Sequence, residues 1–349
     1  MIKKIAGKDY DFSMEKKYFP FTEDAAAGIA TLGEIKIIER IRAAFEKISP
    51  PAPRGIGDDC AVLPAVPENF PAQTAGTPKR LVTTDSVIFS KHFDESVSPE
   101  NAGKKLIRRN VSDIAAMSGV PADAVLALVM SGDVSAAWLD RFLRGVAEAC
   151  TECRVELSGG DVASAPAKHF FSATLALTGF SENPLLRTGA REGDFLYVTG
   201  TLGGSILKKH FDFRPRIDEG RFLAALPDSI VRACIDVTDG LLKDHAALLP
   251  AGTHAEFAFD SLPLSGDART LGGNLIRRAF CDGEDYELLI AVAGTQTDFF
   301  EKTWREKFPG IRISRIAKIV SGAENPELSR RLADARAYEH FVSKESSEA

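Results

Sequence analysis

The 349-residue sequence lacks the features that mark nucleic-acid-binding, membrane and secreted proteins. It has 43 Lys and Arg against 49 Asp and Glu, a formal net charge of −6, so it offers no basic footprint for nucleic acid or an anionic membrane. No apolar run approaches the roughly 18 residues that a membrane span requires. The first basic residues precede no apolar core of about 7 residues, so we expect no signal peptide.

Cysteine is also scarce, and its distribution argues against a disulfide framework. The five cysteines are odd in number and scattered, which is typical of a protein of the reducing cytoplasm. Cys150 and Cys153 form one CxxC, but no second pair follows at zinc spacing, so we interpret them as packing residues at a helix end. The six histidines form no HxH or HxxxH pair, which argues against a histidine metal site.

The hydrophobic pattern predicts alternating helices and strands, and therefore an α/β protein of two domains. Residues 1–32 have mixed charge and no clear period, and we expect an N-terminal extension there. The first domain is predicted over residues 33–182 and the second over residues 183–349, which begins with a turn-rich connector. The clearest expected elements are a helix from Ser98-Pro99 to about Ser118, a strand at 124–130, a helix at about 135–149, and strands at 154–159 and 170–180.

Aspartate recurs beside glycine or a hydroxyl residue at the predicted ends of these elements. The segments are GIGDDC, VTTDS, NVSDIAAMSG, LSGGDVA, CIDVTDGLLKD and CDGEDYELL. Each aspartate taken alone is more typical of a helix cap or a turn. In at least five segments, however, it follows an apolar strand-like run, and strand ends in α/β sheets meet at one edge, where ligands bind.

Carboxylates gathered at one edge would repel one another unless divalent cations held them together. Mg²⁺ prefers carboxylate and hydroxyl oxygens, so the pattern predicts a Mg²⁺ site, with Thr83 and Thr84 as further oxygen donors. Asp113 lies with Asn110 on an otherwise apolar helical stripe, where a buried carboxylate is costly. We interpret Asp113 as a ligand or bridging residue, with a structural hydrogen bond to Asn110 or a backbone amide as the alternative.

Two glycine-rich loops are candidates for phosphate binding. The glycines of SGGD (158–161) follow a predicted strand and allow close backbone approach to an anion. VTGTLGGS (198–205) would lead from a strand into a helix with free N-terminal amides, but it lacks the GK[ST] of a Walker A loop, and tight strand–helix packing explains its glycines equally well. Arg187 on the connector could reach a phosphate or remain a solvated arginine. His92 and Tyr338 have no local signature and are interpreted as packing residues.

Taken in order, these segments resemble the thiamine-monophosphate kinase family, part of the superfamily that includes aminoimidazole ribonucleotide synthetase and selenophosphate synthetase. The resemblance covers about residues 33–345 and rests on GEIKIIERI, GIGDDCAVL, TTDS…KHF, NVSDIAAMSGVP, SGGD, RTGAREGDFLYVTGTLGGS, IDVTDGLLKD, GEDYELL and YEHF. It implies a two-domain aminoimidazole ribonucleotide synthetase-like fold. The N-terminal domain would bind ATP and Mg²⁺ and pair its sheet with a second copy in a homodimer, and the C-terminal α/β domain would close on the nucleotide.

The resemblance also implies a reaction, in which ATP phosphorylates thiamine monophosphate to thiamine diphosphate by in-line transfer assisted by several Mg²⁺ ions. The implied Mg²⁺ ligands are Asp59, Thr83, Thr84, Asp85, Asp113, Asp161, Asp236 and Asp239, and three of them, Asp85, Asp113 and Asp239, are expected to act in catalysis. The implied ATP contacts are Gly160, Asp161, Arg187 and Thr238. The implied contacts to thiamine monophosphate are His92, Glu284 and Tyr338.

The chain departs from the family pattern in four places, one of which is Thr238, which replaces a serine and keeps the hydroxyl. The other three change the side-chain chemistry. GGDVAS lacks the hydroxyl residues that usually follow the aspartate, SVIFSK stands between Asp85 and His92 in place of acidic and glycine residues, and Asp282 replaces a glycine before GEDYE. Two alternatives therefore stay open: another ATP-using enzyme of the superfamily with a different substrate, and a non-catalytic protein that binds a nucleotide or a thiamine phosphate. A non-catalytic binding protein would be expected to have lost metal-binding carboxylates, and none of them is lost.

Overall fold

The structure, a computed structural model, describes residues 3–5, 8–10, 61–64, 78–167, 169–322 and 326–333. The chain divides into two compact units, residues 1–49 with 339–349 and residues 50–338. The described residues of the first unit form two short antiparallel strands, β1 (Lys3–Ile5) and β2 (Lys8–Tyr10). All other described elements belong to the second unit, which contains two sheets.

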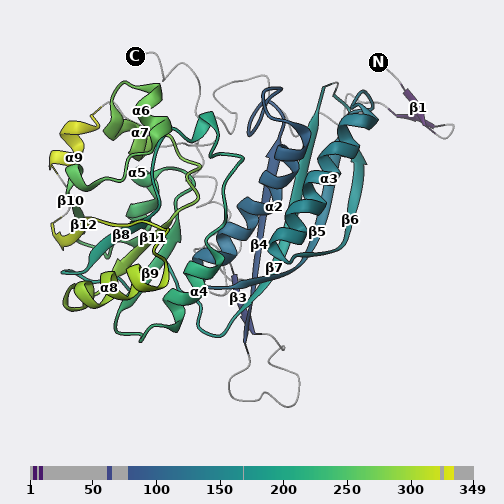
Figure 1. Ribbon diagram of the computed structural model, residues 1–349. Coiled ribbons are helices and arrows are strands. Elements are labelled where there is room, and N and C mark those ends of the chain that lie inside the picture. The colour runs from purple at the N-terminus through teal and green to yellow at the C-terminus, as the bar shows by residue number, and fades with distance from the viewer. Residues whose placement is uncertain are drawn as a thin grey trace. The chain divides into compact units, whose positions relative to one another are not determined.

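The first sheet has five strands in the order β3-β4-β7-β5-β6 (Figure 1). The strands are β3 (Ala61–Pro64), β4 (Lys79–Ile88), β5 (Val120–Met130), β6 (Glu156–Ser164) and β7 (Phe171–Ser181). Neighbouring strands are antiparallel except β5 and β6, which are parallel and need a crossover helix between them. Burial alternates residue by residue along β7, so one face of this sheet is packed and the other is more open.

Two helices pack against the first sheet, α2 (Pro99–Ala116) and α3 (Ala136–Cys153) (Figure 1). As predicted, α2 begins after Ser98, whose side chain accepts a hydrogen bond from the backbone N–H of Asn101. The helices cross closely, because a Cβ on Gly103 would lie 2.2 Å from the carbonyl oxygen of Phe142. The apolar side of α2 is fully buried in the core through Leu106, Ile107, Val111 and Ile114.

The second sheet is antiparallel throughout, in the order β10-β12-β8-β11-β9. Its strands are β8 (Phe195–Thr199), β9 (Val231–Asp236), β10 (Thr253–Phe257), β11 (Leu288–Val292) and β12 (Ile313–Ser321). Every residue of β11, LLIAV, is buried, because apolar clusters cover both faces of this sheet.

Helices contribute to both of those clusters, together with the strands of the second sheet. The α-helices of this half are α4 (Ile217–Ala225), α5 (Leu241–Asp244), α6 (Gly266–Leu271), α7 (Leu275–Cys281), α8 (Thr297–Lys307) and α9 (Pro326–Arg331). The 3-10 helices are η4 (Ser205–Leu207), η5 (His245–Leu248), η6 (Phe259–Ser261) and η7 (Gly294–Gln296). Phe280 of α7 is fully buried in one cluster, and Phe300 and Trp304 of α8 are fully buried in the other.

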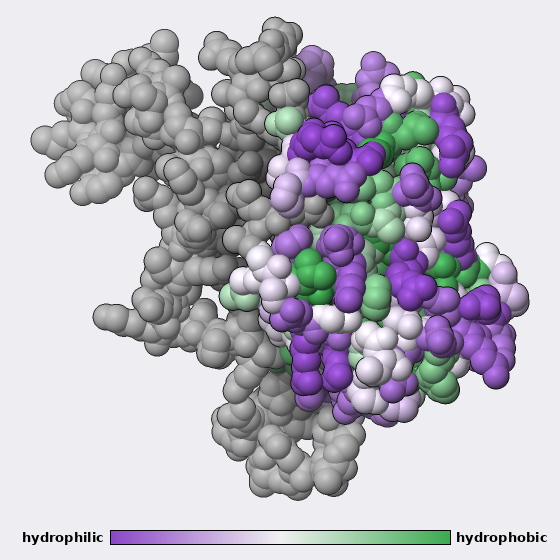
Figure 2. Space-filling view, turned by 90° about the vertical axis from the view of Figure 1, so that its left-hand side faces the viewer, coloured by the Kyte–Doolittle hydropathy of each residue, from purple (hydrophilic) through white to green (hydrophobic). Residues whose placement is uncertain are grey.

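One side of the part that contains the second sheet carries many polar side chains. Figure 2 shows hydrophilic side chains over much of the side that faces left in Figure 1, with hydrophobic side chains in separate patches between them. Among the helices that the structure describes, none is long and apolar enough to span a membrane.

The predicted α/β class is confirmed, and the expected domain boundary near residue 183 falls in the 182–194 connector between β7 and β8, where it stays a prediction. The predicted position of two motifs is wrong. Asp85 and Asp161 lie inside β4 and β6 rather than at strand ends, because the β4–β7 ladder continues past Asp85 to Ile88 and the β5–β6 ladder continues past Asp161 to Ser164.

Candidate active site

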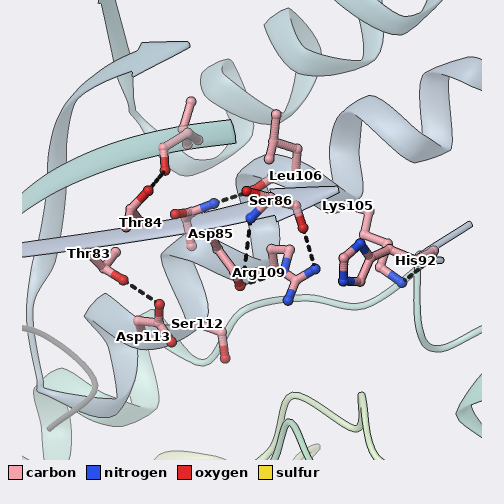
Figure 3. Close-up of polar contacts among 12 residues, drawn as sticks. Thr83, Thr84, Asp85, Ser86, His92, Lys105, Leu106, Arg109, Ser112 and Asp113 are labelled. Carbon is pink, nitrogen blue, oxygen red and sulfur yellow. Dashed lines mark hydrogen bonds and ion pairs between the residues drawn. The ribbon is translucent and has the colours of Figure 1, made fainter. Parts of the chain in front are cut away.

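Two hydrogen-bonded pairs connect the middle of β4 to α2 (Figure 3). Thr83 Oγ1 donates a hydrogen bond of 2.5 Å to Asp113 Oδ2, and Arg109 Nε donates one of 2.5 Å to Asp85 Oδ2. Thr83 and Asp85 share one face of β4 because side chains alternate along a strand, and Arg109 and Asp113 lie one turn apart on α2. The structure thus brings three of the predicted site residues, Thr83, Asp85 and Asp113, to one face of the sheet.

The other predicted residues of the first sheet lie apart from this group. The Thr84 hydroxyl donates to the carbonyl oxygen of Leu175 on β7, so it points away from Thr83 and Asp85 (Figure 3). Gly160 and Asp161 lie on β6, three strands from β4 and so roughly 14 Å across the sheet. A Cβ on Gly160 would lie 1.9 Å from the carbonyl oxygen of Leu126, so strand packing alone requires this glycine.

Asp236, the last residue of β9, connects the second sheet to α2, a helix that packs on the first sheet. Its side chain is buried, and its Oδ2 accepts a hydrogen bond of 2.5 Å from Ser112 Oγ on α2. Ser112 precedes Asp113 on α2, so neighbouring residues of this helix bond to β9 of the second sheet and to β4 of the first. The predicted gathering of carboxylates at one site stays a prediction.

The turn after β9 is held by an aspartate that the motif reading did not single out. Asp244 Oδ2 accepts hydrogen bonds from the backbone N–H groups of Thr238, Asp239 and Gly240, at 2.9, 3.1 and 3.1 Å. The Asp239 carboxylate accepts a hydrogen bond of 2.6 Å from Lys243 Nζ, one turn further along. Thr238 and Asp239 are therefore held in a fixed turn, and Asp239 already has one cationic partner.

The segment that contains Glu284 has an unusual backbone. Glu284 and Tyr286 have φ values of 51° and 50°, in the left-handed region that residues other than glycine rarely adopt. The backbone N–H of Glu284 donates to Thr238 O at 2.7 Å and that of Tyr286 donates to Val237 O at 2.8 Å. Such strain is concentrated at functional sites, where the surrounding structure stabilises it.

A buried lysine that sequence reasoning missed brings two predicted substrate contacts together. Lys105 of α2 is fully buried, and its Nζ lies 2.6 Å from Glu284 Oε1, 2.7 Å from His92 O and 3.1 Å from His210 Nδ1. Burial lowers the pKa of Lys105, whereas Glu284 raises it. Burial, together with the charge of Lys105, lowers the pKa of His210 to about 4, so the imidazole is neutral at pH 7 and accepts through Nδ1.

His92 itself is fixed in place by the backbone of β4. Its Nδ1 accepts a hydrogen bond of 3.0 Å from the backbone N–H of Ile88, and the side chain is half-buried. Figure 3 shows the His92 ring beside the Lys105 side chain, at the end of β4 beyond Asp85. The predicted substrate residues His92 and Glu284 are thus brought together by Lys105, although neither motif contains that lysine.

The loop VTGTLGGS is not followed by the predicted helix. Only the three-residue 3-10 helix η4 follows, and the backbone N–H groups of Gly203 and Gly204 donate to the carboxylates of Asp285 and Asp282. A Cβ on Gly204 would lie 2.3 Å from the backbone nitrogen of Ala268. The packing interpretation is therefore confirmed, and these amides are not left free for a phosphate.

The remaining predicted residues are the cysteine pair, Arg187, Asp59 and Tyr338. Cys150 and Cys153 are free, buried thiols in the last turn of α3, which confirms their interpretation as packing residues. Arg187 is half-buried on the connector between the sheets. Asp59 and Tyr338 lie outside the described residues.

The donor set of the site fits a hard cation in its chemistry. Asp85, Asp113, Asp236 and Asp239 offer carboxylate oxygens and Thr83 offers a hydroxyl, the ligand types that Mg²⁺ prefers. Within the described ranges, no three or more His, Cys, Asp or Glu side chains form a group that could hold a metal ion. Mg²⁺ binding by these residues stays a prediction.

Comparison with known proteins identifies the class. Residues 57–180 match the family described as AIR synthase related protein, N-terminal domain. The solved structure AaThiL complexed with AMPPCP and TMP is 26% identical, with a TM-score of 0.72, and the match covers 91% of this chain and all of that one. A HypE–HypF complex at 14% identity and a TM-score of 0.61 shares the fold alone. The fold is that of the AIR synthase-related proteins.

Curated relatives define the particular family. A thiamine-monophosphate kinase of Rhodopirellula baltica is 33% identical over 277 residues, which are 76% of this chain and 83% of the relative. The Escherichia coli K12 thiamine-monophosphate kinase is 33% identical over 266 residues, 68% of this chain and 76% of the relative. The chain belongs to the thiamine-monophosphate kinase family and is an enzyme of the kinase type, as the sequence motifs predict.

Proposed function

We propose that this enzyme transfers the γ-phosphoryl group of ATP to thiamine monophosphate and so forms thiamine diphosphate. The observation that carries the proposal is its likeness to kinases named for this substrate, one of them solved with both AMPPCP and TMP. The retained carboxylates of Asp85, Asp113, Asp236 and Asp239 support a catalytic protein over a binding protein that kept only the scaffold.

Mg²⁺ ions, when bound, would neutralise the charge that develops on the transferred phosphoryl group. Asp85 and Asp113 are the residues that would hold such ions on the side of the first sheet, and Asp236 and Asp239 those on the side of the second. The hydrogen bond between Ser112 and Asp236 supports this assignment, because it brings both groups to the same part of α2.

The protein's own residues bind and orient the substrates. The acceptor is a phosphate oxygen that is already largely ionised at pH 7, so the reaction requires no strong general base. Glu284 and His92 would position the thiamine phosphate, with Lys105 fixing the Glu284 carboxylate and the backbone at His92. Arg187 and Thr238 would contact ATP, with Gly160 and Asp161 on β6. Orientation and charge neutralisation would then supply the rate enhancement.

We also propose that the enzyme is a cytoplasmic homodimer that pairs its first sheets. The face of β5 opposite α2 and α3 carries Val125 and Val129, which are 47% and 36% exposed, as a sheet face that meets a second copy would. The free thiols of Cys150, Cys153 and Cys281 support a reducing compartment. Light scattering on the purified protein tests the dimer.

The activity test compares ADP release from ATP and Mg²⁺ with thiamine monophosphate, with thiamine, and with no acceptor. We expect turnover only with thiamine monophosphate, and its loss in Asp85→Asn. Asp218→Asn, which removes an exposed surface partner of Arg214, is the matched control and should keep wild-type activity. ATP binding without turnover would favour a binding protein, and turnover with another acceptor alone would favour a different enzyme of the superfamily.

A further inference from the structure

The Asp85 carboxylate is engaged on both of its oxygens (Figure 3). Oδ2 accepts the hydrogen bond of 2.5 Å from Arg109 Nε, and Oδ1 accepts one of 3.0 Å from the backbone N–H of Ser86. Arg109 Nη1 also donates to the carbonyl oxygen of Ser86 at 2.7 Å. The guanidinium therefore binds the side chain of one residue and the backbone of the next.

A second ion pair of the same kind lies one turn earlier on α2. Lys105 Nζ contacts Glu284 Oε1, so two carboxylates of the proposed site, Asp85 and Glu284, each have a cation from the same helix. The four charges balance without any metal. The side chains of Arg109 and Asp85 are only 14% and 29% exposed, so solvent screens this pair less than a surface ion pair.

We propose that Arg109 is a positioning residue that competes with Mg²⁺ for Asp85, so that Asp85 becomes a metal ligand only when Arg109 turns to another anion. The inference rests on the proposed function, in which Asp85 holds Mg²⁺. A carboxylate whose oxygen accepts from a guanidinium binds a divalent cation less tightly, because the two cations repel each other and share its negative charge. Arg109 therefore weakens Mg²⁺ binding to the free enzyme.

The phosphates of ATP are the anion that Arg109 would take up instead. Guanidinium groups bind phosphate oxygens through paired N–H donors, and Arg109 uses only Nε and Nη1 within the described contacts. Mg²⁺ binding at Asp85 is then coupled to nucleotide binding, because the Arg109 side chain binds either Asp85 or the phosphates. The Asp85 carboxylate would then pair with Arg109 in the free enzyme and with Mg²⁺ in the nucleotide-bound enzyme.

The test measures Mg²⁺ affinity by calorimetry in the absence of ATP, for the wild type, Arg109→Met, Arg108→Met and the double variant Arg109→Met/Asp85→Asn. We expect Arg109→Met to bind Mg²⁺ about tenfold more tightly than the wild type. The double variant should lose this gain. Arg108→Met is the matched control, because Arg108 pairs with Glu152 and Asp212 and not with Asp85. Its Mg²⁺ affinity should equal that of the wild type.

Thermal unfolding gives a second measurement. Mg²⁺ should raise the Tm of Arg109→Met more than that of the wild type, because ligand binding stabilises in proportion to affinity. If Arg109→Met does not fold, Arg109→Lys replaces it in the test. Lysine keeps the positive charge but lacks the paired N–H donors of the guanidinium. The Arg109→Lys variant should therefore bind Mg²⁺ more tightly than the wild type, by a smaller factor than expected for Arg109→Met.

Unchanged or weaker Mg²⁺ binding in the Arg109 variant contradicts the inference, as does a gain that persists without Asp85. The proposed function fails separately, if the wild type forms no thiamine diphosphate from thiamine monophosphate. A gain in affinity that depends on Asp85 would support Arg109 as the competitor even in that case.

Discussion

Ser112 on α2 donates a hydrogen bond of 2.5 Å to Asp236 at the end of β9, and this bond connects the helix of the first sheet to a strand of the second. The next residue on α2, Asp113, accepts from Thr83 of β4. Two adjacent side chains of one helix thus contact both sheets. The geometry of the proposed site depends on this junction.

Removal of the Ser112 hydroxyl should loosen the junction. Ser112→Ala leaves the buried Asp236 carboxylate without one donor, and we expect it to lower the free energy of unfolding by about 1–3 kcal/mol, as urea titration would measure. Thr151→Ala removes an exposed hydroxyl that bonds only within α3, and it should change stability by less than about 0.5 kcal/mol. Equal effects of the two substitutions would contradict a special role for the Ser112–Asp236 bond.

Lys105 should affect substrate binding as well as stability. Lys105→Met removes the cation beside Glu284 and the donor to His92 O, and we expect a loss of about 2–4 kcal/mol in stability. In the account above, KM for thiamine monophosphate should rise while KM for ATP changes little. Lys104→Met is the control, because Lys104 pairs with Glu148 nearer the surface. A stability loss with both KM values unchanged would leave Lys105 a purely structural residue.

Asp285 should make stability fall as the pH rises. Burial raises the pKa of Asp285 to about 7 from an ordinary value of 3.8, so the folded protein keeps a proton that the unfolded chain releases. The contribution of this group is full below pH 3.8 and is lost as the pH rises through about 7, by up to about 4 kcal/mol in total.

Asp285→Asn removes the titration and keeps an acceptor for the backbone N–H of Gly203. Compared with the wild type, the variant should therefore become relatively more stable between pH 5 and pH 8, in denaturant titrations at each pH. A stability difference that stays constant over this range would show that Asp285 does not titrate there.

Gly204 should tolerate no side chain. It has a φ of 75°, and a Cβ would lie 2.3 Å from the backbone of Ala268, so Gly204→Ala should cost more than about 3 kcal/mol of stability. Gly266→Ala places a Cβ where no atom lies within 4 Å, and it should be neutral or slightly stabilising. Tolerance of both substitutions would contradict the tight packing of this loop.

The sequence predicts much of the fold because local signals are strong in several elements. Ser98 and Pro99 determine the start of α2, and the apolar runs at 124–130 and 170–180 become β5 and β7. The packing of a polar face of β4 against α2 could not be predicted in the same way. Thr83, Asp85 and Val87 face the helices although two of them are polar, because their partners, Asp113 and Arg109, come from α2.

The sequence motifs single out Asp85 and Glu284 but not the two cations, Arg109 and Lys105, that pair with them. The run KKLIRR reads as part of an amphipathic helix with solvated lysine and arginine side chains. Lys105 is nevertheless fully buried, because its partners Glu284 and His210 come from segments more than 100 residues away. Sequence spacing carries no signal for such contacts, and the partners of Lys105 and Arg109 emerge only from the packing of α2 against both halves.

The most direct test of the account is identification of the product by ³¹P NMR after incubation of the enzyme with ATP, Mg²⁺ and thiamine monophosphate. We expect thiamine diphosphate and ADP in equal amounts, and no product from the Asp113→Asn variant under the same conditions. ADP with inorganic phosphate and unchanged thiamine monophosphate would contradict it.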